Sequence, residues 1–495
     1  MDNRPNADSN PHDFRDRFTE SNFAAGLACL ALLLLAPLCV SRSIEKPLSV
    51  GLPGVVSGDE PHYLVMINSA ISDGDFDLAN NYQDVHRGGV QAGRIFAGSL
   101  LDHHVNWYQQ GELVKWWQAY EMDGGRWDRD INGHPLPTLR LDSRFRPVSE
   151  QEYSQHPVGL AFLLAPFLVA FRGTSLVEPA AIFCSGLATV AGCCAWCWLV
   201  KSYTKVPAHR LAAAAVAYLG SPLWHYGQTL FSESFLACFS VAAYAWALRA
   251  QNYAIAGSLI GAATLIKTPL VLIAVPLIGD ALLRRNWRHA LECAAPIALA
   301  GLLVLYWNRQ MYGDWLRNPQ EWESGSLPEG LFGLSLSWQH GLLLVSPALC
   351  LSVLVLPEWF RDHTRDAILM TMAALLYGGL MAYWAQWWGG ACYSARLILP
   401  IVPFLYVPLA LLFDSRIWRT NRPVRILGIS LITISLVFGA IGAFGCDYVW
   451  GNHPLDIFWR SEHASVALER AGILESGPDV EDRGHSPAVN ARRPR

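Results

Sequence analysis

Long apolar runs recur along most of this chain, and they restrict its possible folds more than any other feature. A helix needs roughly 20 apolar residues to cross a bilayer. Charged residues make up only 16% of the chain, against roughly 25% of an average soluble protein. The sequence therefore predicts an all-α polytopic membrane protein, a bundle of about 10–12 transmembrane helices.

The first apolar run is Phe23–Val40. Asp13, Asp16 and Glu20 precede it, whereas a signal peptide begins with positive charge, so we interpret the run as a retained membrane anchor. The later runs, in chain order, are Pro157–Phe171, Leu176–Val200, Leu211–Leu223, Phe235–Leu248, Tyr253–Leu265, Leu270–Leu283, Ala290–Trp307, Gly341–Leu356, Ala367–Trp384, Leu397–Phe413 and Ile426–Phe444.

The polar segments predict the domain organisation. Residues 1–22 are expected to be a disordered cytoplasmic tail, residues 23–445 the transmembrane domain, and residues 446–495 a largely disordered C-terminal tail. The net charge is only -4 and the chain contains no basic tract, so the sequence indicates no nucleic-acid partner.

Residues 41–156 are predicted to form a large first extracytoplasmic loop. Within it, Arg94–Leu101 and Val114–Tyr120 are expected to be short amphipathic helices on the membrane surface, because Trp and Tyr favour the interface. The loop also contains alternate aspartates at Asp73, Asp75 and Asp77. A calcium loop would need a further terminal Glu, so a solvated turn is favoured there.

Clusters of Lys and Arg predict the orientation, because such clusters mark cytoplasmic loops. One count fails: if Pro157–Phe171 crosses the membrane, Leu176–Val200 runs in the wrong direction to place Lys201 inside. Pro157–Phe171 is therefore either re-entrant or accompanied by a hidden crossing. The segments assigned to the outer side are the Asp59 region, residues 220–233, the turn at Lys267, residues 308–340, residues 386–396 and the C-terminal tail.

An acidic motif, Ser57-Gly-Asp-Glu-Pro-His-Tyr-Leu64, follows the first apolar run. Pro61 suits the first turn of a helix, where its missing N–H is not needed, and Tyr63, Leu64, Ile67 and Ile71 recur at helical spacing. The motif places Asp59 and Glu60 at the positive end of the helix dipole. An ordinary acidic helix cap is the alternative.

Other ionisable residues on the predicted outer side each allow two interpretations. Glu233 either caps the following helix or belongs to a site. Lys267, in a break between two short apolar runs, either snorkels to the interface or contacts a phosphate. Arg396 begins an apolar run on the side where cations are not needed for orientation, and an arginine there suits a phosphate.

Four motifs resemble the GT-C superfamily of integral membrane glycosyltransferases, which includes aminoarabinose transferases and protein O-mannosyltransferases. Asp59-Glu-Pro-His-Tyr63 is similar to the opening motif, with His62 where Arg is common, and His156-Pro-Val-Gly-Leu to the start of the next membrane segment. Ser221–Glu233 resembles a Ser-Pro-aromatic stretch that usually ends in Asp, and Trp388–Pro400 a Gly/Arg-Leu-Leu-Pro element. The resemblance covers most of residues 20–445.

The resemblance implies a GT-C-like bundle that transfers a sugar from a polyprenyl-phosphate donor at the extracytoplasmic face, with inversion. The acceptor would be a glycan, lipid or protein, and the location a bacterial inner membrane. No cofactor is required, although a divalent cation bridging Asp59 and the donor phosphate is an alternative. The implied catalytic residues are Asp59, Glu60 and Glu233, and the implied substrate-binding residues are His62, Tyr63, Lys267, Tyr393 and Arg396.

Two other functions remain open at the level of sequence. Intramembrane ionisable residues and broken spans also occur in transporters and lipid flippases, although no repeat of two similar halves is visible here. The second alternative is a non-catalytic assembly subunit that has the same fold as the transferases. This alternative predicts that substitutions at Asp59 leave function intact.

Overall fold

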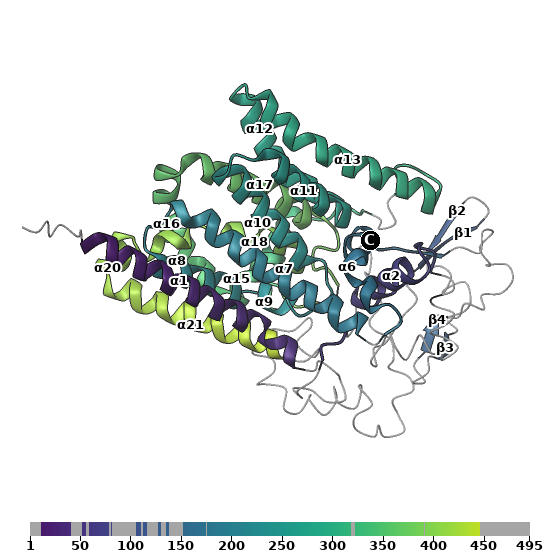
Figure 1. Ribbon diagram of the computed structural model, residues 1–495, viewed down its shortest axis with the longest axis horizontal. Coiled ribbons are helices and arrows are strands. Elements are labelled where there is room, and N and C mark those ends of the chain that lie inside the picture. Colours follow the sequence, from purple (N-terminus) through teal and green to yellow (C-terminus); the bar gives the residue numbers. More distant parts are fainter. Residues whose placement is uncertain are drawn as a thin grey trace, which may run out of the picture.

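The fold is known from a computed structural model of the chain (Figure 1). The structure describes residues 11–40, 52–55, 59–78, 81, 105–109, 112–115, 127–129, 135–137, 152–174, 176–317, 322–390 and 392–445. Helices dominate these residues, and the chain is an integral membrane protein of the all-α polytopic class that the sequence predicts.

Five of the described helical segments are long and apolar enough to cross a bilayer. They lie in α1 (Pro11–Leu35) with η1 (Ala36–Cys39), α7 (Val177–Leu199) with η4 (Val200–Ser202), α13 (Trp287–Tyr312), α17 (Thr364–Tyr383) and α21 (Arg422–Phe444). The predicted disordered tail is wrong in part, because α1 begins at Pro11, well before Phe23.

The other helices of the bundle are shorter. They are α8 (Pro207–Leu219), α9 (Leu223–Tyr226), α10 (Glu233–Arg249), α11 (Tyr253–Ile266), η5 (Thr268–Ala274), α12 (Val275–Leu283), α14 (Leu327–Leu336), α15 (Leu342–Val345), η6 (Pro347–Leu349), α16 (Cys350–Asp362), η7 (Arg396–Ile401), α18 (Val402–Leu405), α19 (Leu409–Leu412) and α20 (Arg416–Thr420). The predicted total of ten to twelve crossings stays a prediction.

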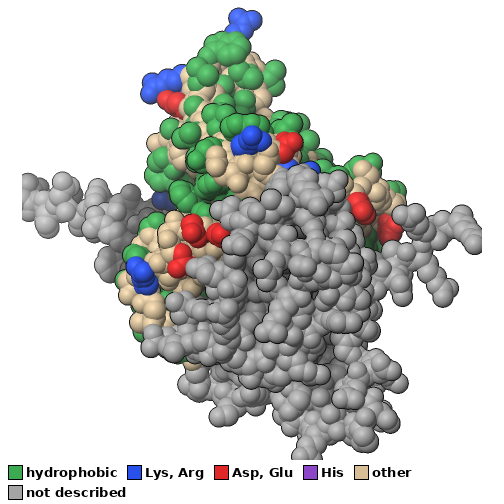
Figure 2. Space-filling view, turned by 90° about the vertical axis from the view of Figure 1, so that its right-hand side faces the viewer, with side chains coloured by type: hydrophobic (Ala, Val, Ile, Leu, Met, Phe, Trp, Pro, Cys, Tyr) green, Lys and Arg blue, Asp and Glu red, His purple; other side chains and the backbone are tan. Residues whose placement is uncertain are grey.

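Helix α10 lies at the centre of the bundle, among α7, α11 and α18 (Figure 1). Its residues are buried on almost every side. At the periphery, α13 exposes Leu291, Leu299 and Leu302, and hydrophobic side chains cover much of the described surface that faces the viewer in Figure 2. An apolar exterior of this kind suits contact with lipid.

Ion pairs join helix ends that the Lys and Arg clusters assign to the cytoplasmic side. Arg249, at the end of α10, donates to Asp366 at the start of α17 over 2.5 Å, and the hydroxyl of Tyr203 donates to the same carboxylate over 2.7 Å. Arg365 binds Asp280 of α12 over 2.7 Å. These contacts place the three helix ends together, as the orientation requires.

We expect Asp366→Asn to destabilise the bundle, because it removes the charge partner of the largely buried Arg249. Breaking a buried ion pair costs roughly 3 kcal/mol or more, so the thermal unfolding midpoint in detergent should fall clearly. Asp362→Asn, in the exposed pair with Arg361, is the matched control and should leave the midpoint unchanged. Equal midpoints for both variants would show that the Arg249 pair contributes nothing.

The sequence left Pro157–Phe171 open between a re-entrant segment and a crossing accompanied by a hidden one. The segment forms α6 (Gly159–Leu168) and η3 (Val169–Phe171), which pack on α2 (Glu60–Ser72). Arg172, just after η3, donates to the backbone carbonyl of Ser72 over 2.8 Å. Helix α6 therefore stays against α2 as far as its end, which favours the re-entrant alternative, while the side of the membrane on which it lies stays a prediction.

The first outer loop contains strands in its described part. Strands β2 (Glu112–Lys115), β1 (Val105–Gln109) and β5 (Glu152–Ser154) form one antiparallel sheet, and β3 (Trp127–Arg129) pairs with β4 (Pro135–Pro137). The predicted helix over Val114–Tyr120 is therefore wrong at Val114 and Lys115, which pair with Trp107 and Asn106. Residues with β-branched and aromatic side chains in β1 favour the extended pairing. Residues 116–120 and the predicted helix Arg94–Leu101 lie outside the described residues.

Candidate active site

Asp59 lies at the start of α2, as the acidic motif predicts. Its side chain makes no capping hydrogen bond to the helix. Instead it accepts a hydrogen bond from Nη1 of Arg396 over 3.0 Å, although the two residues are 337 positions apart. The structure therefore favours the site over the ordinary helix cap for this carboxylate.

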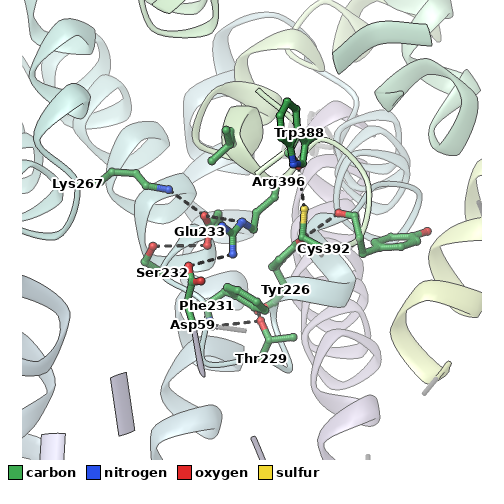
Figure 3. Close-up of polar contacts among 12 residues, drawn as sticks. Asp59, Tyr226, Thr229, Phe231, Ser232, Glu233, Lys267, Trp388, Cys392 and Arg396 are labelled. Carbon is green, nitrogen blue, oxygen red and sulfur yellow. Dashed lines mark hydrogen bonds and ion pairs between the residues drawn. The ribbon is translucent and has the colours of Figure 1, made fainter. Parts of the chain in front are cut away.

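Arg396 stands between two carboxylates (Figure 3). It begins η7, and its Nε lies 3.7 Å from Oε1 of Glu233. Its guanidinium also lies over the ring of Phe231, 4.7 Å from the centroid. Only 10% of the Arg396 side chain is exposed, so the cation is held by charges and an aromatic face rather than by water.

Glu233 joins this pair to a second cation. It begins α10, its side chain is 1% exposed, and Oε1 accepts a hydrogen bond from Nζ of Lys267 over 3.1 Å. Lys267 lies in the predicted break, between α11 and η5, where Pro269 prevents a continuous helix. Its side chain remains 20% exposed. Two carboxylates and two cations from four separate elements thus form one charge-balanced cluster.

Glu60, the neighbour of Asp59, fixes the position of the segment that leads to Glu233. It is fully buried, and its Oε1 accepts the backbone N–H of Leu230 over 2.7 Å. This bond ties the first turn of α2 to the segment that precedes Glu233. Because Glu60 is already engaged with the backbone, the geometry favours a positioning role for it and leaves Asp59 as the accessible carboxylate, 24% exposed.

The electrostatic surroundings set the protonation state of Asp59. Burial by itself would raise the pKa of this carboxyl. The positive charge of Arg396 has the largest opposite effect, and smaller ones come from His156, Lys267 and His62. Together these groups outweigh burial and lower the pKa of Asp59 to about 2. Asp59 is therefore ionised over the whole physiological range as long as Arg396 remains its partner.

His62 and Tyr63 lie on α2 beside the cluster. The ring of His62 stacks on that of His156 at 5.4 Å, and the ring of Tyr63 lies 5.6 Å from the same histidine. Burial raises the pKa of the Tyr63 hydroxyl, and the carboxylates of Asp59 and Glu233 raise it further. His156 was not among the predicted site residues, and its only signal is its place in the His156-Pro motif.

Tyr393 lies in the loop that precedes Arg396 but is engaged elsewhere. Its hydroxyl donates to the backbone carbonyl of Phe438 in α21 over 3.2 Å. Its own carbonyl accepts a hydrogen bond from the hydroxyl of Tyr226 over 2.9 Å. This geometry does not favour the substrate-binding role predicted for Tyr393. The side chain instead secures the loop to the bundle.

In its described part, the same loop contains three residues with positive φ. Gly389 and Gly390 have φ of 73° and 83°, and Ser394 has φ of 55°. Glycine adopts this left-handed region without a steric cost, whereas serine does so rarely. The thiol of Cys392 donates to the carbonyl of Trp388 over 3.2 Å (Figure 3). These features turn the chain so that Arg396 points at Asp59 and Glu233.

The possible metal ligands do not gather into a metal centre in the described residues. No group of three His, Cys, Asp or Glu side chains among them is placed to hold an ion. In the acidic string, Asp75 accepts from the hydroxyl of Ser69 and from the N–H of Asp77. Asp73 accepts from Asn81. This pattern is that of a hydrogen-bonded turn; the alternative of a divalent cation at Asp59 stays a prediction.

The chain was compared with known proteins. No protein-family model and no curated protein matches its sequence. Among solved structures it is similar to ArnT from Cupriavidus metallidurans bound to undecaprenyl phosphate, with 13% identity, a TM-score of 0.47, and coverage of 93% of this chain and 82% of ArnT. It is also similar to apo ArnT from the same organism, with 12% identity, a TM-score of 0.49, and coverage of 90% and 79%.

Proposed function

We propose that this protein is a membrane glycosyltransferase that moves a sugar from a polyprenyl-phosphate donor to an acceptor hydroxyl at the extracytoplasmic face. The observation that carries the proposal is the cluster in which Arg396 lies between Asp59 and Glu233, with Lys267 on Glu233. Three of these four residues lie in motifs that resemble the GT-C superfamily, and Lys267 is the exception. The cluster contains both kinds of group that the transfer needs: an ionised carboxylate and cations that stabilise a departing phosphate.

The cations account for the leaving group. As the bond between the sugar and the phosphate breaks, negative charge develops on the lipid phosphate. Arg396 and Lys267 are largely withdrawn from water, where a charge contact is stronger than in solvent. The apolar helices around the site provide an environment for the polyprenyl chain, which would stay in the bilayer while its phosphate binds the cations.

A carboxylate accounts for activation of the acceptor. A general base works best when its pKa lies near the operating pH, so Asp59 with a pKa of about 2 is a weak base while Arg396 holds it. A donor phosphate would compete for Arg396. With that contact weakened, burial would raise the pKa of Asp59 and make it a stronger base. The donor thus prepares the site for the acceptor.

The remaining groups complete the reaction. Asp59 takes the proton of the acceptor hydroxyl while the hydroxyl oxygen attacks C1 of the sugar. The phosphate leaves from the opposite face, so one displacement inverts the anomeric centre. Glu233 orients Arg396 and Lys267, and Glu60 orients α2. The acceptor class, whether glycan, lipid or protein, is open in this proposal, and the location we propose is a bacterial inner membrane.

The proposed charge coupling predicts a pH effect. The pKa of Asp59 is lowered in the free enzyme, so its carboxylate persists below pH 4, and the acid limb of kcat/KM from this group should lie there. In the donor complex that pKa rises, so the acid limb of kcat should lie at higher pH. In profiles of polyprenyl phosphate release between pH 3 and 8, kcat/KM should show no acid limb from Asp59, because a pKa of about 2 lies below this range, whereas the acid limb of kcat should lie within it. The absence of an acid limb from kcat as well would contradict the competition for Arg396.

The function itself is tested by donor turnover. The purified full chain in lipid nanodiscs is offered undecaprenyl-phosphate-linked hexoses and pentoses with membrane extract as acceptor, and release of free undecaprenyl phosphate is followed. Sustained release supports the proposal. Absence of release from a folded sample with every donor would overturn it. Movement of a fluorescent polyprenyl-phosphate sugar across vesicle membranes, without cleavage, would identify a flippase.

A further inference from the structure

A second group of polar atoms adjoins the charged cluster. Among the described residues, Nδ1 of His340, Oγ of Ser394 and Nε of Arg396 are buried without a hydrogen-bond partner. Buried polar atoms nearly always have a partner, because leaving one unpaired costs the full loss of its hydration. Unpartnered atoms on three residues that contact one another therefore indicate a place where a polar ligand or ordered water binds.

His340 is rigidly placed beside the loop that carries Arg396. It lies between α14 and α15, and only 8% of it is exposed. Its backbone N–H donates to Oγ of Ser337 over 3.2 Å, and its ring meets the ring of Trp387 edge-on at 6.1 Å. The ring is also hydrogen-bonded to the backbone of Ser394, which leaves Nδ1 as the nitrogen without a partner.

The surroundings favour the neutral form of this histidine. Burial lowers the pKa of His340, the hydrogen bond to the Ser394 backbone raises it, and the positive charge of Arg396 lowers it, with a net lowering. Because Nδ1 has no partner, the ring N–H that donates to the Ser394 carbonyl is assigned to Nε2. Nδ1 then carries a lone pair, so it accepts a hydrogen bond and cannot donate one.

Ser394 completes the group. Its side chain is fully buried, and its backbone has φ of 55°. A serine is held in this strained conformation only when its surroundings determine it. Its carbonyl accepts the backbone N–H of Arg396 over 2.9 Å. The backbone of Ser394 therefore contacts both Arg396 and the ring of His340.

We propose that Nδ1 of His340 and Oγ of Ser394 form a hydroxyl-binding subsite that holds the sugar of the donor next to the charged cluster. This inference rests on the proposed function and adds a specificity site to it. A sugar hydroxyl donates to Nδ1 and accepts from the Ser394 hydroxyl, and adjacent hydroxyls on one ring satisfy both residues. A phosphodiester has no proton to give to a neutral imidazole at neutral pH, so its place is with the cations.

Binding measurements in nanodiscs separate the two kinds of ligand. The probes are undecaprenyl phosphate without a sugar, undecaprenyl-phosphoryl glucose, mannose and galactose, and monodeoxy analogues of the hexose that binds best. The variants are Ser394→Ala, which removes only the hydroxyl, and His340→Phe. His363→Phe is the matched control, because His363 is a partly buried histidine whose ring is tilted against that of Tyr203, outside the cluster.

Each site variant should weaken binding of the hexosyl lipid by roughly three- to tenfold, the effect of one neutral hydrogen bond. Binding of undecaprenyl phosphate should not change, and this unchanged affinity also shows that each variant is folded. One monodeoxy analogue should bind the parent and Ser394→Ala equally, because it lacks the hydroxyl that the serine recognises. The control variant should match the parent with every probe.

Three results would overturn the inference. Equal weakening of both lipids would assign the subsite to phosphate. Unchanged binding of both lipids would show that His340 and Ser394 hold only water, while the proposed function would stand. A folded parent that binds none of the lipids would remove the proposed function and the subsite together.

Discussion

Asp59→Asn is expected to abolish sugar transfer almost completely while leaving the protein folded and able to bind its donor. The amide has the same shape as the carboxylate, but it cannot accept the proton of the acceptor hydroxyl. Loss of a general base lowers kcat by about 10²–10⁴-fold. Because Arg396 also loses a charged partner and gains freedom to bind phosphate, the KM for the donor should stay equal or fall. Release of undecaprenyl phosphate under saturating donor measures kcat.

Glu60→Gln is the comparison that decides whether Asp59 or Glu60 is the base. Glu60 accepts a backbone N–H from Leu230, and the glutamine oxygen keeps that acceptor. A positioning residue should therefore tolerate the change with a much smaller loss of kcat. If Glu60→Gln abolishes transfer and Asp59→Asn does not, the base is Glu60. If neither variant loses activity, the base lies elsewhere, and a non-catalytic role for the acidic motif becomes the better explanation.

Arg396→Gln is expected to have the second large effect, on both transfer and stability. Removing one preorganised charge contact to a developing anion costs about 10²–10³-fold in kcat. It also leaves Asp59 and the buried Glu233 with Lys267 as their remaining cation in the cluster, and an uncompensated buried charge is destabilising. Arg396→Lys should recover only part of the rate, because a single ammonium cannot span both carboxylates as the guanidinium does.

A double variant separates these two effects. Asp59→Asn/Arg396→Gln removes one charge of each sign, so its thermal midpoint should recover toward that of the parent, although it should remain inactive. Non-additive stability of this kind is the signature of a direct contact. A double variant as unstable as the sum of its single changes would show that the 3.0 Å contact between Arg396 and Asp59 does not stabilise the protein.

Several parts of the fold could be predicted because they depend on neighbours in sequence. The helix that begins after Asp59 follows from Pro61 and the spacing of the apolar residues after it. The break at Lys267 follows from Pro269. The long apolar helices follow from composition, whereas the orientation read from loop charges stays a prediction.

Other parts could not be predicted, because they depend on partners far away along the chain. The pairing of Val114 with Trp107 makes a strand where local composition suggests an interfacial helix. The contact between Arg172 and Ser72 holds the segment after α6 against the end of α2, although the composition of α6 is that of a membrane span. In both segments, tertiary contacts outweighed a local preference that is worth only a fraction of a kcal/mol per residue.

The sequence by itself determined the membrane class of this protein and the residue types available for chemistry, because hydropathy and short motifs act locally. Only the tertiary structure decided which of those residues meet. It joined Asp59 to Arg396 across 337 positions, engaged Glu60 and Tyr393 elsewhere, and brought in His156 and His340. The reason is physical: burying a charge is costly unless an opposite charge or a hydrogen bond compensates it, and that partner is chosen by packing.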